Sequence, residues 1–254
     1  MPKKYKKLLG IDVGATGIKG AIVDLKTGEF LTDRFKFPTP QPATPAACAV
    51  VMKQIGKSVG WKKGDRVGCG FPSVVLGGVT LSASNIDDSW IGLNAQEFLS
   101  AKTGYKISLA NDADVAGIAE VRFGHIPKTG TVLLLTIGTG IGSALFYNGN
   151  LIPNTEFGHI PYKRSIAEDY VSNRARKQRK LSVHAWAINL NEYLEYINRI
   201  VTPELIVLGG GISKRFDEYS QYINPGVKVI PARQLNNAGI TGAALYANME
   251  GKRS

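Results

Sequence analysis

Leu8 to Gly20 reads LLGIDVGATGIKG, and the organisation of the whole chain follows from this stretch. Its first apolar residues suit a buried strand, and Asp12 appears where that strand should end. Gly14 and Gly17 then form a turn, after which the apolar pattern resumes as a second strand. Glycines let a backbone approach a bulky anion and direct its N–H groups at it. The stretch therefore predicts a hairpin whose tip binds phosphate, with an ordinary glycine hairpin as the alternative.

The side chains around this turn suit a phosphate donor and its metal ion. Thr16 adds a hydroxyl donor, Lys19 can add positive charge, and Asp12 can hold a metal ion or its waters. The spacing differs from that of a Walker A loop and from that of the dinucleotide-binding fingerprint. The first turn is therefore a candidate site for a phosphoryl donor, and its candidate residues are Asp12, Gly14, Thr16, Gly17 and Lys19.

The composition describes a basic protein with a packed core. Of the 254 residues 44% are hydrophobic, which excludes general disorder, and the formal net charge is +11. Such a charge favours a polyanionic partner, namely nucleic acid, an anionic membrane or a phosphate-rich substrate. No run of eighteen apolar residues is present, so we expect no membrane-spanning helix. Among the polyanionic partners we expect a phosphate-rich substrate and not a membrane. Cys48 and Cys69 lack metal-site spacing and are expected to be buried thiols in a reducing compartment, the cytoplasm.

The pattern of a strand followed by a glycine turn recurs twice. Thr131 to Thr136 is an apolar strand that leads into Gly138-Thr139-Gly140 and then into another strand. Pro203 to Leu208 is a buried strand that ends in Gly209-Gly210-Gly211. The repeated strand-turn-strand unit suggests a duplicated fold with a phosphate chain clamped between its halves. The third turn suits a nucleotide base, a ribose or the far end of a phosphate chain. The donor-binding assignments in this half are Thr136, Gly138, Thr139, Gly140, Gly209, Gly210 and Gly211.

A carboxylate follows the short strand predicted at residues 107–110, in the sequence Asn111-Asp112. Open α/β folds place their chemistry at such strand ends, in the crevice that the strands face. Asp112 is therefore a candidate catalytic residue. The alternative is that Asp112 only caps the helix that follows.

Two further groups of polar side chains lie in the second half of the chain. Glu156 and His159 are three residues apart around a glycine, a spacing that suits two side chains on one face of a turn. Glu168 stands at the start of a predicted helix, which carries a basic run and continues from Leu181 to Ile200. The run is either a solvated face or a guide for a long polyanion. Its members are Arg174, Arg176, Lys177, Arg179 and Lys180.

In combination, the three glycine turns, Asn111-Asp112 and Glu156-Phe157-Gly158-His159 resemble the ROK family of sugar kinases, which shares the actin/hexokinase ATPase fold. The segment EDYVSNRARKQRKLS and the short chain are most similar to the polyphosphate glucokinase branch. The resemblance implies a duplicated, ribonuclease H-like α/β fold of two lobes around a central cleft. Residues 1–110 would form the N-terminal lobe, with a C-terminal helix at 239–254 packed back on it, and residues 111–238 the C-terminal lobe.

The resemblance also implies an activity, namely transfer of the terminal phosphoryl group of inorganic polyphosphate to the 6-hydroxyl of glucose with Mg²⁺. The aspartate matching Asp112 is the general base in such enzymes. Glucose would be bound by the residues matching Asn85, Asn111, Asp112, Glu156, His159 and Glu168. ATP as the donor, alone or beside polyphosphate, is the first alternative, and an actin-like ATP-binding protein that modifies no sugar is the second. A nucleic-acid partner is disfavoured because no recognition motif is present. A homodimer is the family expectation.

One departure from the family concerns zinc. Many relatives carry a Cys-rich zinc motif between the histidine and the later glutamate, whereas this chain has Ile160 to Ala167 without a cysteine. We therefore expect no structural zinc site, and His159 would serve the sugar alone.

Overall fold

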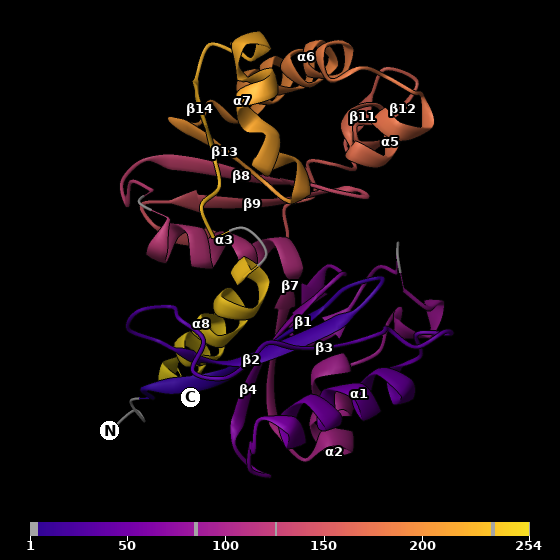
Figure 1. Ribbon diagram of the computed structural model, residues 1–254, viewed down its shortest axis with the longest axis vertical. Coiled ribbons are helices and arrows are strands. Elements are labelled where there is room, and N and C mark those ends of the chain that lie inside the picture. The colour runs from indigo at the N-terminus through magenta and orange to yellow at the C-terminus, as the bar shows by residue number, and fades with distance from the viewer. Residues whose placement is uncertain (1–4, 84–85, 125, 235–236, 254) are drawn as a thin grey trace. The chain divides into compact units, whose positions relative to one another are not determined.

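The computed structural model describes residues 5–83, 86–124, 126–234 and 237–253, and it divides into two compact units (Figure 1). The first unit comprises residues 1–123 and 237–254, and the second comprises residues 124–236. The expected lobe boundary lies after Ala110. In the observed division helix α3 (Asp112–Phe123) belongs to the first unit, because it packs along helix α8 (Ala238–Arg253).

The first unit contains a sheet, four α-helices, a small hairpin and a 3₁₀ turn. In chain order its elements are β1 (Lys7–Val13), β2 (Ile18–Asp24), β3 (Phe35–Phe37), α1 (Pro45–Ser58), β4 (Arg66–Phe71), β5 (Val75–Leu76), β6 (Val79–Thr80), η1 (Asp88–Trp90), α2 (Ala95–Thr103), β7 (Lys106–Asn111), α3 and α8.

The second unit contains a sheet of the same size and a group of short helices before and after one long helix. Its elements are β8 (Thr131–Ile137), β9 (Ile141–Tyr147), β10 (Asn150–Ile152), β11 (Pro161–Tyr162), β12 (Ser165–Ile166), α4 (Glu168–Val171), α5 (Asn173–Gln178), α6 (Val183–Val201), β13 (Leu205–Gly209), η2 (Gly211–Arg215), α7 (Phe216–Tyr219), η3 (Ser220–Tyr222) and β14 (Lys228–Pro231).

The two five-stranded sheets have the same strand order and the same strand directions. The first has the order β3-β2-β1-β4-β7, in which β2 is antiparallel to both of its neighbours and β1, β4 and β7 are parallel. The second repeats this as β10-β9-β8-β13-β14, with β9 antiparallel to its neighbours and β8, β13 and β14 parallel. In both sheets a glycine turn joins the first two strands. The duplicated α/β fold predicted from the recurring turns is therefore confirmed.

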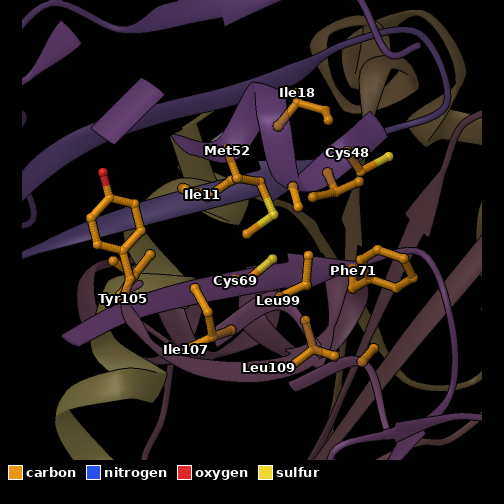
Figure 2. Close-up of a cluster of buried hydrophobic side chains, with 14 of the residues drawn as sticks. Ile11, Ile18, Cys48, Met52, Cys69, Phe71, Leu99, Tyr105, Ile107 and Leu109 are labelled. Carbon is orange, nitrogen blue, oxygen red and sulfur yellow. The ribbon is translucent and has the colours of Figure 1, made fainter. Parts of the chain in front are cut away.

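One face of the first sheet packs against α1 and α2 to form an apolar core. Ile11 and Cys69 from the sheet are fully buried together with Met52 of α1 and Leu99 of α2 (Figure 2). Each fully buried aliphatic side chain of this kind contributes roughly 1.5–3 kcal/mol to folding. Cys48 and Cys69 are both free and buried, as the sequence predicts, and burial raises the pKa of the Cys48 thiol to about 11.

The opposite face of the first sheet carries glycines, and α8 approaches it closely. A Cβ atom on Gly68 would lie 1.8 Å from the carbonyl oxygen of Ala243, and one on Gly10 would lie 2.0 Å from that of Ile240. Only a strand without side chains at these two positions can accept the helix backbone at this distance. The Ala- and Gly-rich sequence of α8 keeps the helix narrow on the same side.

The long helix α6 forms the core of the second unit with the sheet. Trp186, Leu190 and Leu194 on α6 are fully buried against apolar residues of β8, such as Leu133 and Leu135. Their spacing of four residues puts all three on one stripe of the helix. The buried Tyr193 also lies on this side of the helix.

The basic run and α6 do not form one continuous helix, so this expectation is wrong. Helix α5 ends at Gln178, and Lys180 takes a left-handed conformation with φ 52°. Ser182 then starts α6, because its side chain accepts a hydrogen bond from the backbone N–H of Ala185. A serine cap and a left-handed residue in direct succession end one helix and start another.

No helix in the described ranges combines the length and the apolar character that crossing a membrane would require.

The close contact between α8 and the first sheet can be tested by giving Gly68 a side chain. Gly68→Ala should destabilise the protein by about 1–3 kcal/mol or more, because the new methyl group overlaps the backbone of Ala243. Denaturant unfolding followed by circular dichroism measures this. Gly60→Ala is the control, because a Cβ there meets open space and costs only the strain of its φ of 66°, roughly 1 kcal/mol. Equal midpoints for the two variants would contradict the predicted overlap.

Candidate active site

The first glycine turn is held from inside and exposed at its tip. The N–H of Gly14 donates to the carbonyl of Gly17 at 3.1 Å, which closes the turn between β1 and β2. The hydroxyl of Thr39 donates to the Gly14 carbonyl and ties the turn to the segment after β3. Ala15 and Thr16 at the tip are exposed. The turn therefore has a base held by hydrogen bonds and an exposed tip at residues 15 and 16.

Asp12 and Lys19 form a cross-strand ion pair below this turn. They are register partners on β1 and β2, and Lys19 Nζ lies 3.3 Å from Asp12 Oδ2. The start of α8 closes over the carboxylate, since a Cβ on Gly239 would lie 2.9 Å from Asp12 Cγ. Both side chains keep part of their surface exposed, at 18% for Asp12 and 29% for Lys19. An incoming phosphate could therefore compete for the lysine and release the carboxylate.

The residues around Asp12 suit a magnesium ion that takes most of its ligands from a substrate. Across the described ranges no group of three or more His, Cys, Asp or Glu side chains is arranged to hold a metal ion. Mg²⁺ is commonly bound through one or two carboxylates, with waters and substrate phosphates as the other ligands. A single, partly exposed carboxylate beside a phosphate-binding turn fits that pattern.

Asn111 ends β7 and caps α3. Its Oδ1 accepts hydrogen bonds from the N–H groups of Ala113 and Asp114, at 2.8 and 3.2 Å. Its Nδ2 donates to the carbonyl of Ser73 at 3.1 Å, and the residue is only 7% exposed. The cap of α3 is therefore Asn111, so capping does not by itself account for Asp112. Asp112 is partly exposed in the first turn of the helix, where its Oδ1 accepts from the Ala113 N–H at 2.7 Å.

Asp12 and Asp112 share one edge of the first sheet. Asp12 on β1 is in register with Gly70 on β4, which is in register with Ala110 on β7. A Cβ on Gly70 would lie 3.7 Å from the Cα of Asp112 and 3.9 Å from the Gly239 carbonyl. Both carboxylates thus stand at the carboxyl ends of parallel strands, where α/β sheets bind ligands.

The second and third glycine turns lie side by side in the second unit. Thr136 and Gly209 are register partners at the carboxyl ends of the parallel strands β8 and β13. Gly210 has a φ of 79°, and a Cβ there would lie 2.5 Å from the Ile137 carbonyl oxygen. Gly138 closes the second turn by donating its N–H to the Gly140 carbonyl at 2.9 Å. The second and third glycine turns therefore start from neighbouring strand ends of the second sheet.

Glu168 joins the second turn to the polar cluster. Its Oε2 accepts a hydrogen bond from the N–H of Ile141 at 3.1 Å and lies 3.7 Å from Nε2 of His159. Its Oε1 lies 3.3 Å from Nη2 of Arg174. The carboxylate fills the space that a side chain on residue 140 would need, because a Cβ on Gly140 would lie 2.3 Å from Oε2. Gly140 is therefore required for this contact.

Glu156 completes a chain of carboxylate, imidazole and carboxylate. Its Oε2 lies 3.1 Å from Nδ1 of His159, so the imidazole is placed between Glu156 and Glu168. Burial raises the pKa of Glu156 above its ordinary value, and the negative charge of Glu168 adds to that effect, whereas His159 opposes it. The predicted grouping of Glu156, His159 and Glu168 is thus present in the second unit. A cluster of this kind offers several hydrogen-bond acceptors and donors to a polyhydroxylated ligand.

The five members of the basic run have different surroundings. Arg174 pairs with Glu168, and Arg176 donates to Asn173 Oδ1 at 3.1 Å and to the Leu181 carbonyl at 3.4 Å. The guanidinium of Arg179 lies 4.5 Å from the ring centre of Tyr170. Lys177 and Lys180 are exposed. Only part of the run is therefore a freely solvated basic surface.

Asn85, which the family resemblance adds to the sugar contacts, lies outside the described residues. Conversely, the structure adds Lys36 to the surroundings of the first turn. Lys36 on β3 is in register with Lys19, and its side chain passes over Gly17, where a Cβ would lie 2.8 Å from Cε. The sequence offers no local signal for Lys36, because only strand register brings it there.

The raised pKa of Glu156 predicts a pH-dependent effect of Glu156→Gln on stability. A glutamate whose pKa is raised by folding stabilises the fold fully below its unfolded value, near 4.5, and this contribution is lost as the pH rises through the folded pKa. The neutral glutamine escapes that loss. The variant should therefore gain stability over the parent protein as the pH rises from 4 to 7, with little difference at the acid end.

Denaturant unfolding at a series of pH values measures this difference. Glu29→Gln, at an exposed position in the turn after β2, is the control for the loss of a surface carboxylate. A Glu156→Gln variant that loses stability relative to the parent as the pH rises would contradict the direction of the pKa shift.

Comparison with known proteins agrees with this geometry. A sequence model of the ROK family matches residues 8–175. A polyphosphate glucokinase of Mycobacterium tuberculosis (strain CDC 1551 / Oshkosh) is 43% identical over 238 residues, which cover 93% of this chain and 89% of that protein. The crystal structure of an inorganic polyphosphate/ATP-glucomannokinase from Arthrobacter sp. strain KM is 41% identical, with a TM-score of 0.92 over 97% of this chain and 100% of that one.

A ROK family glucokinase from Streptomyces griseus, solved in complex with glucose and AMPPNP, has the same fold at 23% identity, with a TM-score of 0.79 over 96% of this chain and 99% of that one. The actin/hexokinase-like fold class predicted from the sequence is confirmed by these likenesses. The family model matches about two thirds of this chain, and a relative of 43% identity matches nearly all of it. This chain therefore belongs to the ROK family.

Proposed function

We propose that this protein is a polyphosphate-dependent glucokinase, which transfers the terminal phosphoryl group of inorganic polyphosphate to the 6-hydroxyl of glucose. The observation that carries the proposal is the 43% identity to a polyphosphate glucokinase over almost the whole chain. The net charge of +11 supports it, because a donor with about one negative charge per phosphate gains strongly from a basic surface.

Asp112 is the general base of the proposed reaction. As the 6-oxygen of glucose forms its bond to the terminal phosphorus, its proton passes to the Asp112 carboxylate. The bond between that phosphorus and the bridging oxygen breaks, and the shortened polyphosphate leaves with the electron pair. Phosphoryl transfer needs little covalent help beyond alignment and charge stabilisation. The position of Asp112 in the first turn of α3, beside the capping Asn111, supports this role, because the helix fixes the carboxylate.

Glucose is bound by the polar side chains assigned from the sequence. The cluster of Glu156, His159 and Glu168 reads the sugar hydroxyls through hydrogen bonds, and Asn111 contributes its amide. Asn85 is retained as a proposed contact. A site of this kind discriminates against sugars that lack a hydroxyl, because its own polar groups would then remain unpaired.

The phosphoryl donor is held by the glycine turns. Backbone N–H groups near Gly14 and at Gly138 to Gly140, with the hydroxyls of Thr16 and Thr139, bind the phosphates. Lys19 adds charge. Mg²⁺ would be held near Asp12 and would neutralise charge on the phosphates when bound.

ATP is the second candidate donor, alone or beside polyphosphate. The specific support is the Arthrobacter relative, whose name joins both donors and both glucose and mannose. The exposed Gly210 and Gly211 beside β8 would accommodate the nucleoside part of ATP. Parallel assays of glucose 6-phosphate formation with polyphosphate and with ATP separate the donors. Formation from ATP alone would reject polyphosphate dependence, and formation from neither would reject the proposed function.

We further propose that the protein acts in the cytoplasm as a homodimer. The two free, buried cysteines agree with a reducing compartment, and the dimer follows from the family resemblance. Sedimentation at assay concentrations tests the dimer, and a single monomeric species would refute it.

Asp112→Asn tests the catalytic assignment. Because asparagine keeps the shape but cannot accept the proton, kcat should fall roughly 10²- to 10⁴-fold, while the affinity for glucose should change little. Steady-state kinetics and glucose titration calorimetry measure the two quantities. Asp24→Asn is the matched control, since the Asp24 carboxylate accepts hydrogen bonds from the backbone N–H groups of Lys26 and Thr27 in the turn after β2. Ordinary turnover in Asp112→Asn would show that another group is the base.

The exposed lysines of the basic run test the polyanion path. Lys177→Gln combined with Lys180→Gln should raise the KM for polyphosphate several-fold and flatten its dependence on salt, because fewer ions are released on binding. The KM for glucose should not change. Lys62→Gln combined with Lys106→Gln is the control, because these lysines are also exposed but belong to the first unit. If the KM for polyphosphate depends on salt identically in both double variants, the basic run is only a solvated face and not a path for the polyanion.

A further inference from the structure

The turn that carries Glu156 and His159 is held by two side chains from the core. The turn, Thr155 to His159, closes through the N–H of His159, which donates to the carbonyl of Glu156 at 2.9 Å. At its centre is Phe157, whose N–H donates to Oγ of Ser143 at 3.0 Å. The carbonyl of Phe157 accepts a hydrogen bond from the hydroxyl of Tyr193 at 2.9 Å. Both polar groups of this one backbone residue are therefore bound by side chains.

Ser143 holds the start of the turn as well as its centre. Its hydroxyl donates to the carbonyl of Thr155 at 2.6 Å while it accepts from Phe157. Its Oγ also lies 3.1 Å from the hydroxyl oxygen of Thr155. A single serine on β9 thus binds both sides of Glu156 in the chain. Rotation of the peptide groups next to Glu156 would break at least one of these bonds.

Ser143 and Tyr193 are themselves enclosed by the protein. Ser143 is 1% exposed on β9, which pairs with β10 and β8 on its two sides, and Tyr193 is completely buried on α6. The ring of Tyr193 meets that of Tyr162 edge to face, with centroids 5.9 Å apart. Tyr162 belongs to the small hairpin β11–β12, and Tyr196 packs against it from the same helix as Tyr193. Ser143 therefore attaches the turn to the sheet, and Tyr193 attaches it to α6 and its aromatic cluster.

We propose that Ser143 and Tyr193 are positioning residues for glucose, which act by fixing the Phe157 peptide and so the directions of Glu156 and His159. This inference rests on the proposed function, because it assumes that these two side chains bind the sugar. Neither Ser143 nor Tyr193 needs to touch the substrate. A site that reads hydroxyl groups requires its acceptors in place before the ligand arrives, since a loosely held shell loses affinity.

The conditions in the cluster make such positioning necessary. Glu156 and Glu168 are two carboxylates that face the same imidazole, at 3.1 and 3.7 Å. The Glu156 side chain is 29% exposed and burial of the rest raises its pKa, so water can replace a lost partner only in part. Glu156 and His159 are both on the turn, whereas Glu168 is on α4. A small displacement of the turn would therefore separate His159 from Glu168 and leave it next to Glu156. The two hydroxyl anchors prevent that displacement through the backbone, without adding charge to the site.

Tyr193→Phe tests the proposal by removing one oxygen atom while keeping the ring. The Phe157 carbonyl then loses its buried donor, and the KM for glucose should rise roughly tenfold. The KM for polyphosphate should stay within about twofold, and kcat at saturating glucose should change less than the KM for glucose. Ser143→Ala should act in the same direction. Calorimetric titration with glucose should give the same loss of affinity without any turnover.

Tyr196→Phe is the matched control. It lies on the same helix and in the same aromatic cluster, and no hydrogen bond found in the described part of the chain links Tyr196 to the turn. Its glucose KM should equal that of the parent protein. If Tyr193→Phe lowers the melting temperature but leaves the glucose KM and affinity at the control level, the hydroxyl is only structural and the proposal is overturned.

Failure of the proposed function gives a different result. In that case the parent protein itself would neither form glucose 6-phosphate nor bind glucose. A parent protein that does both, with Tyr193→Phe and Ser143→Ala indistinguishable from Tyr196→Phe, would overturn the positioning role alone.

Discussion

The hydrogen bond from the Ile141 N–H to the Glu168 carboxylate joins the parts of the candidate site in the second unit. It connects the start of β9 to the start of α4, and it exists only because residue 140 has no side chain. The same carboxylate contacts His159 and Arg174. The glycine turn, the sugar cluster and the first member of the basic run are consequently parts of one connected structure.

In the first unit, the absence of glycine side chains shapes the whole contact between α8 and the sheet. Gly10 and Gly68 clear the face of the sheet on which α8 lies, and Gly239 lets the start of that helix close over Asp12. A sheet face without side chains gives up dispersion contacts and gains direct backbone packing. This close packing positions Asp12 and Asp112 at the carboxyl edge of the sheet, which is formed by the parallel strands β1, β4 and β7 and covered by α3 and α8. Glycine therefore has structural tasks in this chain besides any contact with phosphate.

The sequence predicts those features that depend on local pattern. The strands before the glycine turns, the duplicated topology and the grouping of Glu156 with His159 follow from apolar periodicity and short spacings. The break between α5 and α6 was missed, because the left-handed Lys180 and the cap at Ser182 carry no apolar signal.

Long-range contacts were missed for another reason. Lys36 reaches the first turn through strand register, and Tyr193 reaches the Phe157 carbonyl from 36 residues away. Neither distance in sequence nor residue type indicates such a contact. The same limit applies to the cap of α3, where Asn111 and Asp112 are equally good candidates by residue type and only the hydrogen bonds of Asn111 decide between them.

Electrostatics links the sugar cluster to the donor turn. A carboxylate bonded next to the Gly138 to Gly140 turn would repel a phosphate bound there, by about 4 kcal/mol at 4 Å for an effective dielectric constant near 20. Arg174 lies 3.3 Å from Glu168 Oε1, and the N–H of Arg174 also donates to the Gly138 carbonyl at 3.3 Å. The arginine that offsets the charge of Glu168 is thus attached by its own backbone to the turn that the phosphates would approach. In the proposed reaction, glucose needs the Glu168 carboxylate as a hydrogen-bond acceptor, and polyphosphate would be repelled by its charge. Because Arg174 offsets that charge, the neutral sugar and the polyanion can be bound close together.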